Sequence, residues 1–405
     1  MPITLKPLPP LDAIAAFDLR KANLSESFSW QDFWQEDHAT AFTVAKSAGF
    51  DILKDVSDAF EKALKDGRTP AEFARSLRPV LEAKGWWGKK LVEDPLTGEV
   101  RPAQLGSARR LQTIFDANMR VSYAAGHWAG FERNRRGRPF LRYVCILDER
   151  TRPAHRARHN LVLPIDHPYW DMWAPPCGWN CRCTLQSLSQ RDIDRLLVEG
   201  EELRFEPPED TFRNFVNRRT GEIMRVPDGI DPGWAYNPGR AGYEARVNRA
   251  VAEKIADASP ELVKAAVEER VGSSAFERFV TQPQGSMPVM PISPALAASL
   301  GIDARVALLS AETMAKQIAR HPEMTIADYR LLPSFPDKAT IAIVDGPLSV
   351  VLIRLASGRW LHAVVKSTRS RKAAFLTSFR FTSEDRVQKL IEREGARIVF
   401  DRRKE

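Results

Sequence analysis

Apolar residues recur every three or four positions through most of residues 1–140, which is the spacing of helices that bury one face. The spacing is clearest in residues 11–21 (LDAIAAFDLRK) and residues 39–67. A longer stretch of the same kind runs from about Pro102 to Arg136, where a glycine and a proline follow and end it. The pattern predicts a mainly helical N-terminal region, residues 1–140.

One helix start in this region can be located from its capping residues. The Thr69 hydroxyl can accept a hydrogen bond from the backbone of the first turn, and Pro70 suits the first helical position. Glu72 can reach back to the backbone N–H of Thr69, which completes a capping box. The sequence therefore predicts a helix that begins directly after Thr69.

The pattern changes near residue 140. Residues 141–148 (LRYVCILD) have the character of a strand, and residues 148–184 are rich in His, Pro, Trp and Cys. That composition is typical of a loop region that holds particular side chains in place, and turn signals continue to about residue 240. We expect a Cys/His-rich loop module with an extension over residues 141–245.

In the last part of the chain, segments with the apolar spacing of helices alternate with segments that have the alternating pattern of strands. Residues 246–304 are predicted to hold a helical segment and a linker, since residues 281–294 (TQPQGSMPVMPISP) are rich in Pro, Gly and Ser. In residues 305–405, four short strand-like runs lie between a helical run and a final helix. The sequence thus predicts an α+β multidomain protein that ends in a small α+β domain with an antiparallel sheet.

Composition narrows the environment and the partners. Four cysteines in 405 residues are too few for a disulfide scaffold and favour a reducing compartment. No apolar run approaches the roughly 20 residues that cross a bilayer, and the N-terminus lacks the pattern of a secretory signal, so we expect no membrane association. The net charge is +8, and residues 286–405 carry 19 Lys or Arg against 12 Asp or Glu. This surplus suits a polyanion such as nucleic acid, or a domain that is merely basic.

The segment WDMWAPPCGWNCRCTL, residues 170–185, contains three of the four cysteines. Cys181 and Cys183 lie two residues apart, so in an extended segment their thiols point the same way and could bind one ion, whereas a disulfide between them would be strained. With Cys177 and His155 they would make a tetrahedral set for a structural zinc. Two alternatives stay open: buried thiols that pin the loop, and a catalytic or redox thiol, with Cys177 next to a histidine.

Two kinds of side chain are expected to support this segment. The carboxylate of Asp148 could orient the imidazole of His155, as carboxylates often do for a metal-binding or catalytic histidine. The tryptophans of the segment are expected to cover it with apolar surface, or to be exposed at a partner interface. They are Trp170, Trp173 and Trp179.

The ordered motifs LDERTRPAHRARHN, DHPYWDMWAPPCGWNCRC and VPDGIDPGWAYNPG resemble the phage Mu F-like minor head proteins, the phage head morphogenesis family, over about residues 30–240. The matching residues are Asp148, Arg150, Thr151, His155, Pro175, Pro176, Cys181, Arg182 and Cys183. The resemblance implies a minor capsid protein of a Mu-like phage or prophage. It would be made in the bacterial cytoplasm, packaged in the virion, and associated with portal, capsid or scaffold proteins and with nucleic acid. The family pattern has no cysteine at Cys177, which favours a metal site of His155, Cys181, Cys183 and one further ligand.

Residues 305–402 are similar to phage-encoded nucleases of the barnase–EndoU–colicin–RelE group, which implies a toxin-like, metal-independent ribonuclease. Such cleavage needs a base, an acid and cations around the phosphate. Strand alternation places His362 and Lys366 on the same face of one strand. In the next strand it places Ser378 and Arg380 on one face and Phe375, Phe379 and Phe381 on the other. His321 is a second candidate base, and the turn residues Arg369, Arg371 and Lys372 would bind nucleic acid around the site.

Three functions therefore follow from the sequence. The first is a structural protein of the phage head, and the second adds a ribonuclease effector at the C-terminus. The third is a metal-dependent enzyme centred on His155, Cys181 and Cys183. A cationic sheet that binds packaged DNA without chemistry would use the same C-terminal residues. No cluster of Asp and Glu in the sequence favours a Mg²⁺-dependent nuclease.

Overall fold

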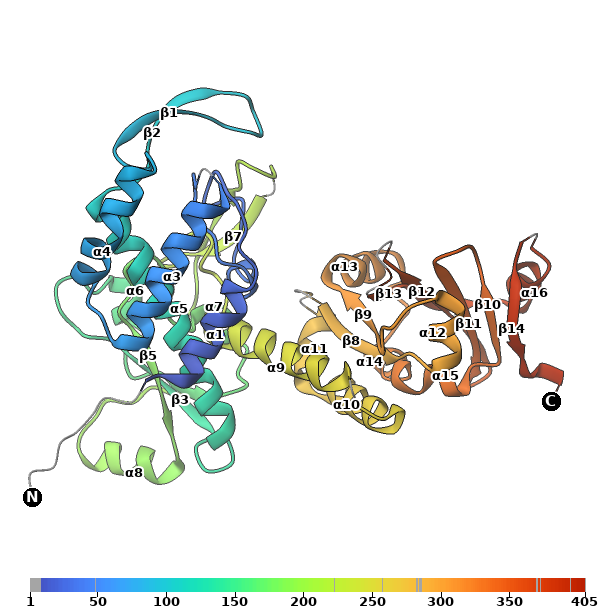
Figure 1. The fold of residues 1–405 in the computed structure, drawn as a ribbon. Helices are drawn as coiled ribbons and strands as arrows, with labels where there is room; N and C mark the ends of the chain where they lie inside the picture. The colour runs from blue at the N-terminus through green and yellow to red at the C-terminus, as the bar shows by residue number, and fades with distance from the viewer. Residues whose placement is uncertain are drawn as a thin grey trace, which may run out of the picture. The chain divides into compact units, whose positions relative to one another are not determined.

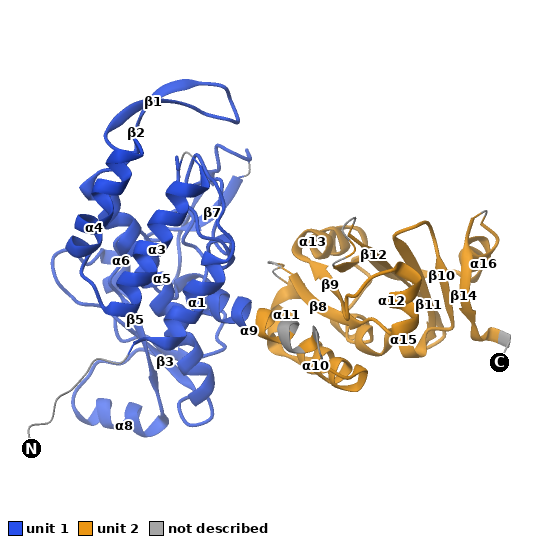
Figure 2. Cartoon of the chain, in the orientation of Figure 1, with its two compact units in different colours: residues 1–246 blue, residues 247–405 orange. Residues whose placement is uncertain are grey.

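The computed structural model describes residues 9–47, 49–221, 223–256, 258–281, 283, 286–368, 371, 373–393 and 395–404. It confirms an α+β architecture and divides into two compact units, which we call the N-terminal unit (residues 1–246) and the C-terminal unit (residues 247–405) (Figure 2). The finer division into four parts stays a prediction. None of the helices in these described ranges is both long and apolar enough to cross a membrane.

Helices form most of the first half of the N-terminal unit, as predicted. They are α1 (Leu11–Lys21), α2 (Asp37–Thr40), α3 (Phe50–Asp66), α4 (Pro70–Ala83) and α5 (Ala108–Asn134) (Figure 1). Their apolar faces meet in one core that contains Phe17, Phe60 and Phe115. Helices α1 and α5 pack closely because Gly126 lacks a side chain, since a Cβ there would lie 2.9 Å from the backbone nitrogen of Ala13.

The predicted capping box is present at the start of α4. The backbone N–H of Thr69 donates to Oε2 of Glu72 at 2.8 Å, and the backbone N–H of Glu72 donates to the Thr69 hydroxyl at 3.3 Å. The cap can be read from sequence because its two partners are only three residues apart.

A β-hairpin precedes α5 where the sequence predicts helix. Strands β1 (Lys89–Glu93) and β2 (Val100–Gln104) pair in antiparallel fashion. Helix α5 therefore begins at Ala108, after the Ser107 hydroxyl accepts a hydrogen bond from the backbone N–H of Arg110. Nearly all hairpin residues are exposed, so no alternation of apolar and polar positions reveals the strands.

The second half of the N-terminal unit is built around a three-stranded antiparallel sheet in the order β4-β3-β5. Its strands are β3 (Phe140–Val144), β4 (Val162–Pro164) and β5 (Thr184–Leu188). The remaining elements are α6 (Pro153–Arg156), α7 (Trp170–Trp173), α8 (Gln190–Val198), the pair β6 (Phe212–Val216) and β7 (Ile223–Pro227), and α9 (Pro238–Ala256), which runs past the unit boundary. Much of the chain from 145 to 183 is loop, as its composition predicts.

The C-terminal unit contains a seven-stranded sheet in the order β14-β10-β11-β12-β13-β9-β8 (Figure 1). The strands are β8 (Ser286–Pro291), β9 (Val306–Ser310), β10 (Ile341–Val344), β11 (Ser349–Ala356), β12 (Arg359–Ser367), β13 (Ala374–Thr382) and β14 (Arg397–Asp401). The helices are α10 (Pro260–Gly272), α11 (Ser274–Thr281), α12 (Pro294–Leu300), α13 (Ala311–Arg320), α14 (Ile326–Tyr329), α15 (Phe335–Lys338) and α16 (Glu384–Ile391), with short 3₁₀ turns η1 (Leu332–Ser334) and η2 (Arg402–Lys404).

This sheet is antiparallel except at one junction. Strand β9 runs parallel to β13 and pairs with it through two residue pairs, Ala307 with Ala374 and Leu308 with Phe375. One face of the sheet carries the larger apolar core, and the other carries a smaller core that includes Val387 of α16. Part of the segment predicted to be a linker, Ser286–Pro291, is instead the edge strand β8.

Candidate functional site

Three side chains with metal-ligand atoms gather at one end of the sheet in the N-terminal unit. The Nδ1 atom of His155 lies 3.7 Å from Sγ of Cys181 and 3.7 Å from Sγ of Cys183. All three ligand atoms lie within 4.8 Å of one another. His155 and Cys181 are buried and Cys183 is partly buried. We call these three residues the Cys/His cluster.

Short elements bring the cluster together. His155 lies on the single-turn helix α6, which begins with Pro153. Cys181 and Cys183 lie in the segment that leads into β5, and their sulfurs face the same imidazole nitrogen, as an i, i+2 spacing predicts. The structure therefore brings together three of the four residues predicted as metal ligands, and the i, i+2 spacing accounts for the shared direction of the two cysteines.

The orientation of the His155 ring is set by a backbone carbonyl. Its Nε2 atom lies 2.9 Å from the carbonyl oxygen of Gly229. Because a carbonyl only accepts hydrogen bonds, Nε2 carries a proton, and the ring is turned so that Nδ1 is directed at the two sulfurs. Gly229 is needed at this position, since its φ is +100° and a Cβ would lie 2.4 Å from the Cβ of Ala154.

The expectation that Asp148 orients His155 is wrong. The Asp148 carboxylate instead accepts hydrogen bonds from the guanidinium of Arg182, at 2.7 Å for Nη1, and from the Thr151 hydroxyl at 3.2 Å. These bonds hold the pKa of Asp148 well below its usual range, chiefly through Arg182. Charge-assisted bonds between a guanidinium and a carboxylate are strong, so Asp148 fixes the segment that carries Cys181 and Cys183.

The two other cysteines flank the cluster. Sγ of Cys145 lies 3.4 Å from Sγ of Cys183, and Sγ of Cys177 lies 3.9 Å from the hydroxyl of Tyr143. Cys177 is fully buried with Trp173 in an apolar core. Sequence reasoning missed Cys145, although the strand register contains the signal: Val144 pairs with Thr184, so the next residues, Cys145 and Cys183, face each other.

The thiols differ in acidity. Hydrogen bonds from Cys177 and then from Cys183 hold the pKa of Cys181 well below the usual thiol range, whereas burial raises the pKa of Cys177 well above it. Cys181 is therefore a more acidic thiol than Cys177.

Comparison with known proteins identifies the family. Residues 54–186 match the family model described as "Phage Mu protein F like protein". The chain is 33% identical over 301 residues to "Putative capsid assembly protein F" of Escherichia phage Mu, an alignment that covers 69% of this chain and 66% of that protein. The chain belongs to the Mu F-like family.

A second relative extends the comparison. The "Mu-like prophage FluMu F protein" of Haemophilus influenzae is 33% identical over 229 residues, which cover 54% of each chain. The chain thus spans a little less than two thirds of the first relative and about half of the second. No solved structure matches the chain significantly.

The residues that carry the Mu F-like resemblance converge on the Cys/His cluster. His155, Cys181 and Cys183 form it, and Arg182 binds Asp148 next to it. Pro175 and Pro176 line a pocket together with Cys181 and Cys183. The family signature is therefore one packed structure, although its residues are spread over 36 positions from Asp148 to Cys183.

A buried ionic network supports the loop module from the other side. The guanidinium of Arg158 pairs with Asp210, donates to the carbonyl of Ala154 at 2.6 Å, and lies 3.3 Å from the ring centroid of Trp173. The indole N–H of Trp173 donates to Asp210 at 2.8 Å. Trp173 also packs edge-on against His155, with ring centroids 6.1 Å apart. The network therefore fixes the position of Trp173, the side chain that packs against His155 of the Cys/His cluster.

The three tryptophans of the module have different environments. Trp170 and Trp173 are fully buried, while Trp179 is 37% exposed and packs against Trp234. Two of them therefore act as core residues, and the third remains available at the surface.

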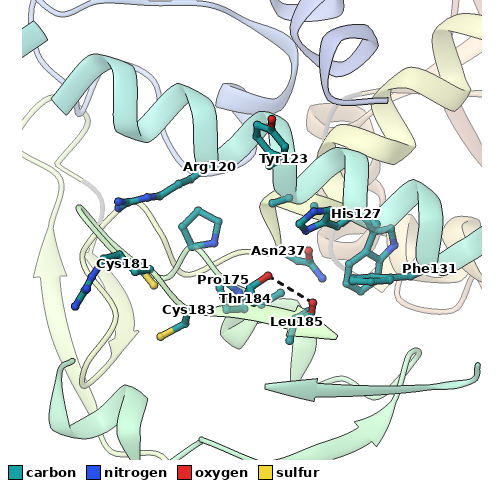
Figure 3. Close-up of a pocket in the computed structure, with 16 residues that line it drawn as sticks. Arg120, Tyr123, His127, Phe131, Pro175, Cys181, Cys183, Thr184, Leu185 and Asn237 are labelled. Atoms are coloured by element: carbon teal, nitrogen blue, oxygen red, sulfur yellow. Dashed lines mark hydrogen bonds between the residues drawn. The ribbon is translucent and has the colours of Figure 1, made fainter. Parts of the chain in front are cut away.

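A pocket of about 260 Å³ borders the cluster in this Mu F-like module (Figure 3). Side chains of α5, including Arg120, Tyr123 and His127, line it on one side, and the segment of Cys181 and Cys183 lines it on the other. Burial lowers the pKa of His127, so its imidazole is neutral at pH 7. The helix side of the pocket thus combines polar side chains with the aromatic rings of Trp128 and Phe131.

The sheet of the C-terminal unit brings four of the predicted nuclease residues onto one face. His362 lies directly opposite Arg380, and Ser378 lies opposite Val364, two residues from His362. Lys366 follows on the same face of β12. The placement of Phe375 on the opposite face is wrong, because a β-bulge shifts the register and leaves Phe375 opposite Lys366.

His362 itself is buried. Its side chain is 6% exposed, and Nδ1 has no hydrogen-bond partner within the described residues. Burial, followed by the charge of Arg380, lowers the pKa of His362 to about 4. The imidazole is therefore neutral at pH 7 and retains a free acceptor or donor nitrogen.

Of the other predicted residues, the two that the structure describes, His321 and Arg371, do not join this face. His321 ends α13, where its Nδ1 lies 3.2 Å from Glu323, and α13 packs on the sheet face that carries Phe379, opposite His362. The guanidinium of Arg371 lies against Gly301, where a Cβ would come within 2.4 Å of it. Arg369 and Lys372 lie outside the described residues.

Proposed function

We propose that this chain is a minor head protein that acts in capsid assembly of a Mu-like phage or prophage. The observation that carries the proposal is the identity of 33% over 301 residues to a protein named for capsid assembly. The grouping of His155, Cys181 and Cys183 within the region that the family model matches supports it.

The finer features of the role follow from the family resemblance. The chain would be carried in the virion and would contact portal, capsid or scaffold proteins during head assembly. It would also lie near packaged nucleic acid, which suits the cationic surplus of residues 286–405. The exposed Trp179 is a suitable anchor for a protein partner, since exposed tryptophans are enriched at interfaces.

Deletion of the coding sequence from an inducible prophage that encodes this protein tests the proposal. We expect defective or empty heads, and restored heads when the full chain is supplied in trans. Mass spectrometry of purified virions should find the chain, and affinity purification from induced cells should recover portal protein with it. Normal particle assembly without the chain would refute the role.

A second candidate function, RNA cleavage by the C-terminal unit, is favoured by one observation. His362, Arg380, Ser378 and Lys366 share a sheet face, and the neutral His362 could accept a proton while the cations stabilise a phosphate. Its burial requires that substrate binding uncover the ring.

The effector function is tested with the full chain and labelled RNA. His362→Ala and Arg380→Ala should abolish cleavage. His321→Ala should leave it unchanged, because His321 ends a helix that packs on the opposite face of the sheet. Binding of RNA or DNA without cleavage by the wild-type chain would favour a packaged-DNA contact instead. Equal loss in all three variants would contradict the assignment to this face.

A further inference from the structure

We infer that Cys145 completes the Cys/His cluster to form a four-ligand, tetrahedral zinc site. The site would consist of His155, Cys181, Cys183 and Cys145, with Cys177 outside it. It would lie at the open end of the three-stranded sheet and join β3, α6 and the segment that enters β5.

The separations within the cluster agree with the edges of a zinc tetrahedron. Zinc binds sulfur at about 2.3 Å and imidazole nitrogen at about 2.0 Å, so tetrahedral geometry separates sulfur from nitrogen by about 3.6 Å and two sulfurs by about 3.8 Å. The two sulfur-to-Nδ1 distances in the structure are both 3.7 Å. These two edges therefore have the length that the ion requires, and the edge between Cys181 and Cys183 is at most 4.8 Å long.

The ring of His155 is prepared for metal binding by its second nitrogen. Metal-binding histidines usually donate their other N–H to a carbonyl or carboxylate, which fixes the tautomer and the ring orientation. The 2.9 Å contact from Nε2 to the Gly229 carbonyl supplies this bond. The ring is therefore held with Nδ1 directed at the sulfurs of Cys181 and Cys183.

The strand register selects Cys145 as the fourth ligand. Val144 pairs with Thr184, so Cys145 lies across from Cys183, and their sulfurs are 3.4 Å apart. The Cys145 thiol donates to the backbone carbonyl of His155 at 3.2 Å and lies outside the group of ligand atoms within 4.8 Å of one another, so binding of the ion would require its side chain to turn toward the cluster. Cys177 also lies next to Cys181, but it is fully buried in the apolar core with Trp173 and Val226, and its thiol contacts Tyr143.

The donor set points to zinc and to a structural role. Three thiolates and one imidazole form a soft tetrahedral set, which suits Zn²⁺ and not Mg²⁺ or Ca²⁺. Four protein ligands leave no open coordination position, so the ion would hold the module together and would not activate water. This assignment argues against a metal-dependent enzyme at the cluster.

The test is zinc content of the full chain, purified without chelator after expression with added zinc. Plasma mass spectrometry should find one zinc per chain in the wild type and in Cys177→Ser. Cys145→Ser, Cys181→Ser and Cys183→Ser should each lose most of it. In chain reconstituted with Co²⁺, the visible spectrum of the wild type and Cys177→Ser should show tetrahedral d–d bands.

Loss of zinc through misfolding is separated from loss of a ligand by a conservative change. His155→Cys keeps a ligand atom and should retain zinc, whereas His155→Ala should not; circular dichroism of each variant reports folding. A wild-type chain that takes up no zinc overturns the inference. So does zinc that survives in Cys145→Ser but is lost in Cys177→Ser, or a disulfide between Cys145 and Cys183 found by thiol counting in freshly purified protein.

Discussion

Replacing Asp210 with alanine would leave the buried charge of Arg158 without its carboxylate. The Arg158 side chain is 5% exposed and that of Asp210 is 12% exposed, so neither charge is well hydrated. Removing one partner of a buried ion pair costs about 3–5 kcal/mol, because the remaining charge stays desolvated. The change also removes the acceptor of the Trp173 indole N–H, so the upper part of this range is expected.

The effect can be measured as a thermal shift. In a domain of about 150–250 residues, 1 kcal/mol moves the melting temperature by about 2–4 °C, and the N-terminal unit has 246 residues. For about 4–5 kcal/mol we therefore expect its transition in calorimetry to fall by about 8–20 °C in Asp210→Ala, with the transition of the C-terminal unit unchanged.

The matched control is an exposed ion pair in the other unit. Asp345 pairs with Arg393 at 2.9 Å, and their side chains are 33% and 60% exposed. Asp345→Ala should cost less than about 1 kcal/mol, since solvent screens such pairs. The reasoning is refuted if Asp210→Ala melts within about 2 °C of the wild type, or if both variants lose the same stability.

Three further outcomes are expected. Gly229→Ala should destabilise the N-terminal unit by about 2–4 kcal/mol in urea unfolding, because φ is +100° and the added Cβ would meet Ala154 at 2.4 Å; an unchanged midpoint would contradict the packing. Since the pKa of His362 is lowered from 6.5 to about 4, the unfolded chain binds a proton in this range that the folded chain does not. Stability of the C-terminal unit should therefore fall by about 3 kcal/mol as the pH drops from 6.5 to 4, and this loss should be absent in His362→Leu. Thr69→Ala should cost about 1 kcal/mol in thermal unfolding by loss of its bond with Glu72, whereas Thr69→Ser should retain most of that stability.

The sequence predicts elements well where the signal is local. The cap at Thr69 and the i, i+2 pair of Cys181 and Cys183 each depend on residues within three positions, and both are present in the structure. The hairpin β1–β2 was missed because its strands are exposed on both sides and therefore lack alternation. Strand β8 was missed because its prolines made it resemble a linker, although prolines are tolerated in an edge strand.

At the site, too, contacts between residues far apart in the sequence could not be predicted. The partner of Asp148 could not be chosen from sequence, because His155 and Arg182 are both plausible and only the fold brings the guanidinium to the carboxylate. The carbonyl of Gly229 carries no side-chain signal and lies 74 residues from His155. Cys145 could have been found only by pairing two strands in register, and the bulge that moved Phe375 shows how one extra residue defeats such pairing.

The short parallel junction between β9 and β13 has a consequence for synthesis on the ribosome. Strands β8 and β9 leave the ribosome well before Ala374, so the inner edge of β9 has no partner while residues up to that point are being made. Unpaired strand edges invite pairing with other chains. On the outer side, Pro288 and Pro291 of β8 withhold two backbone donors. While the chain is being synthesised, prolines protect the outer edge of the β8–β9 pair, but its inner edge has no partner. Until β13 has been made, this edge can pair with other chains.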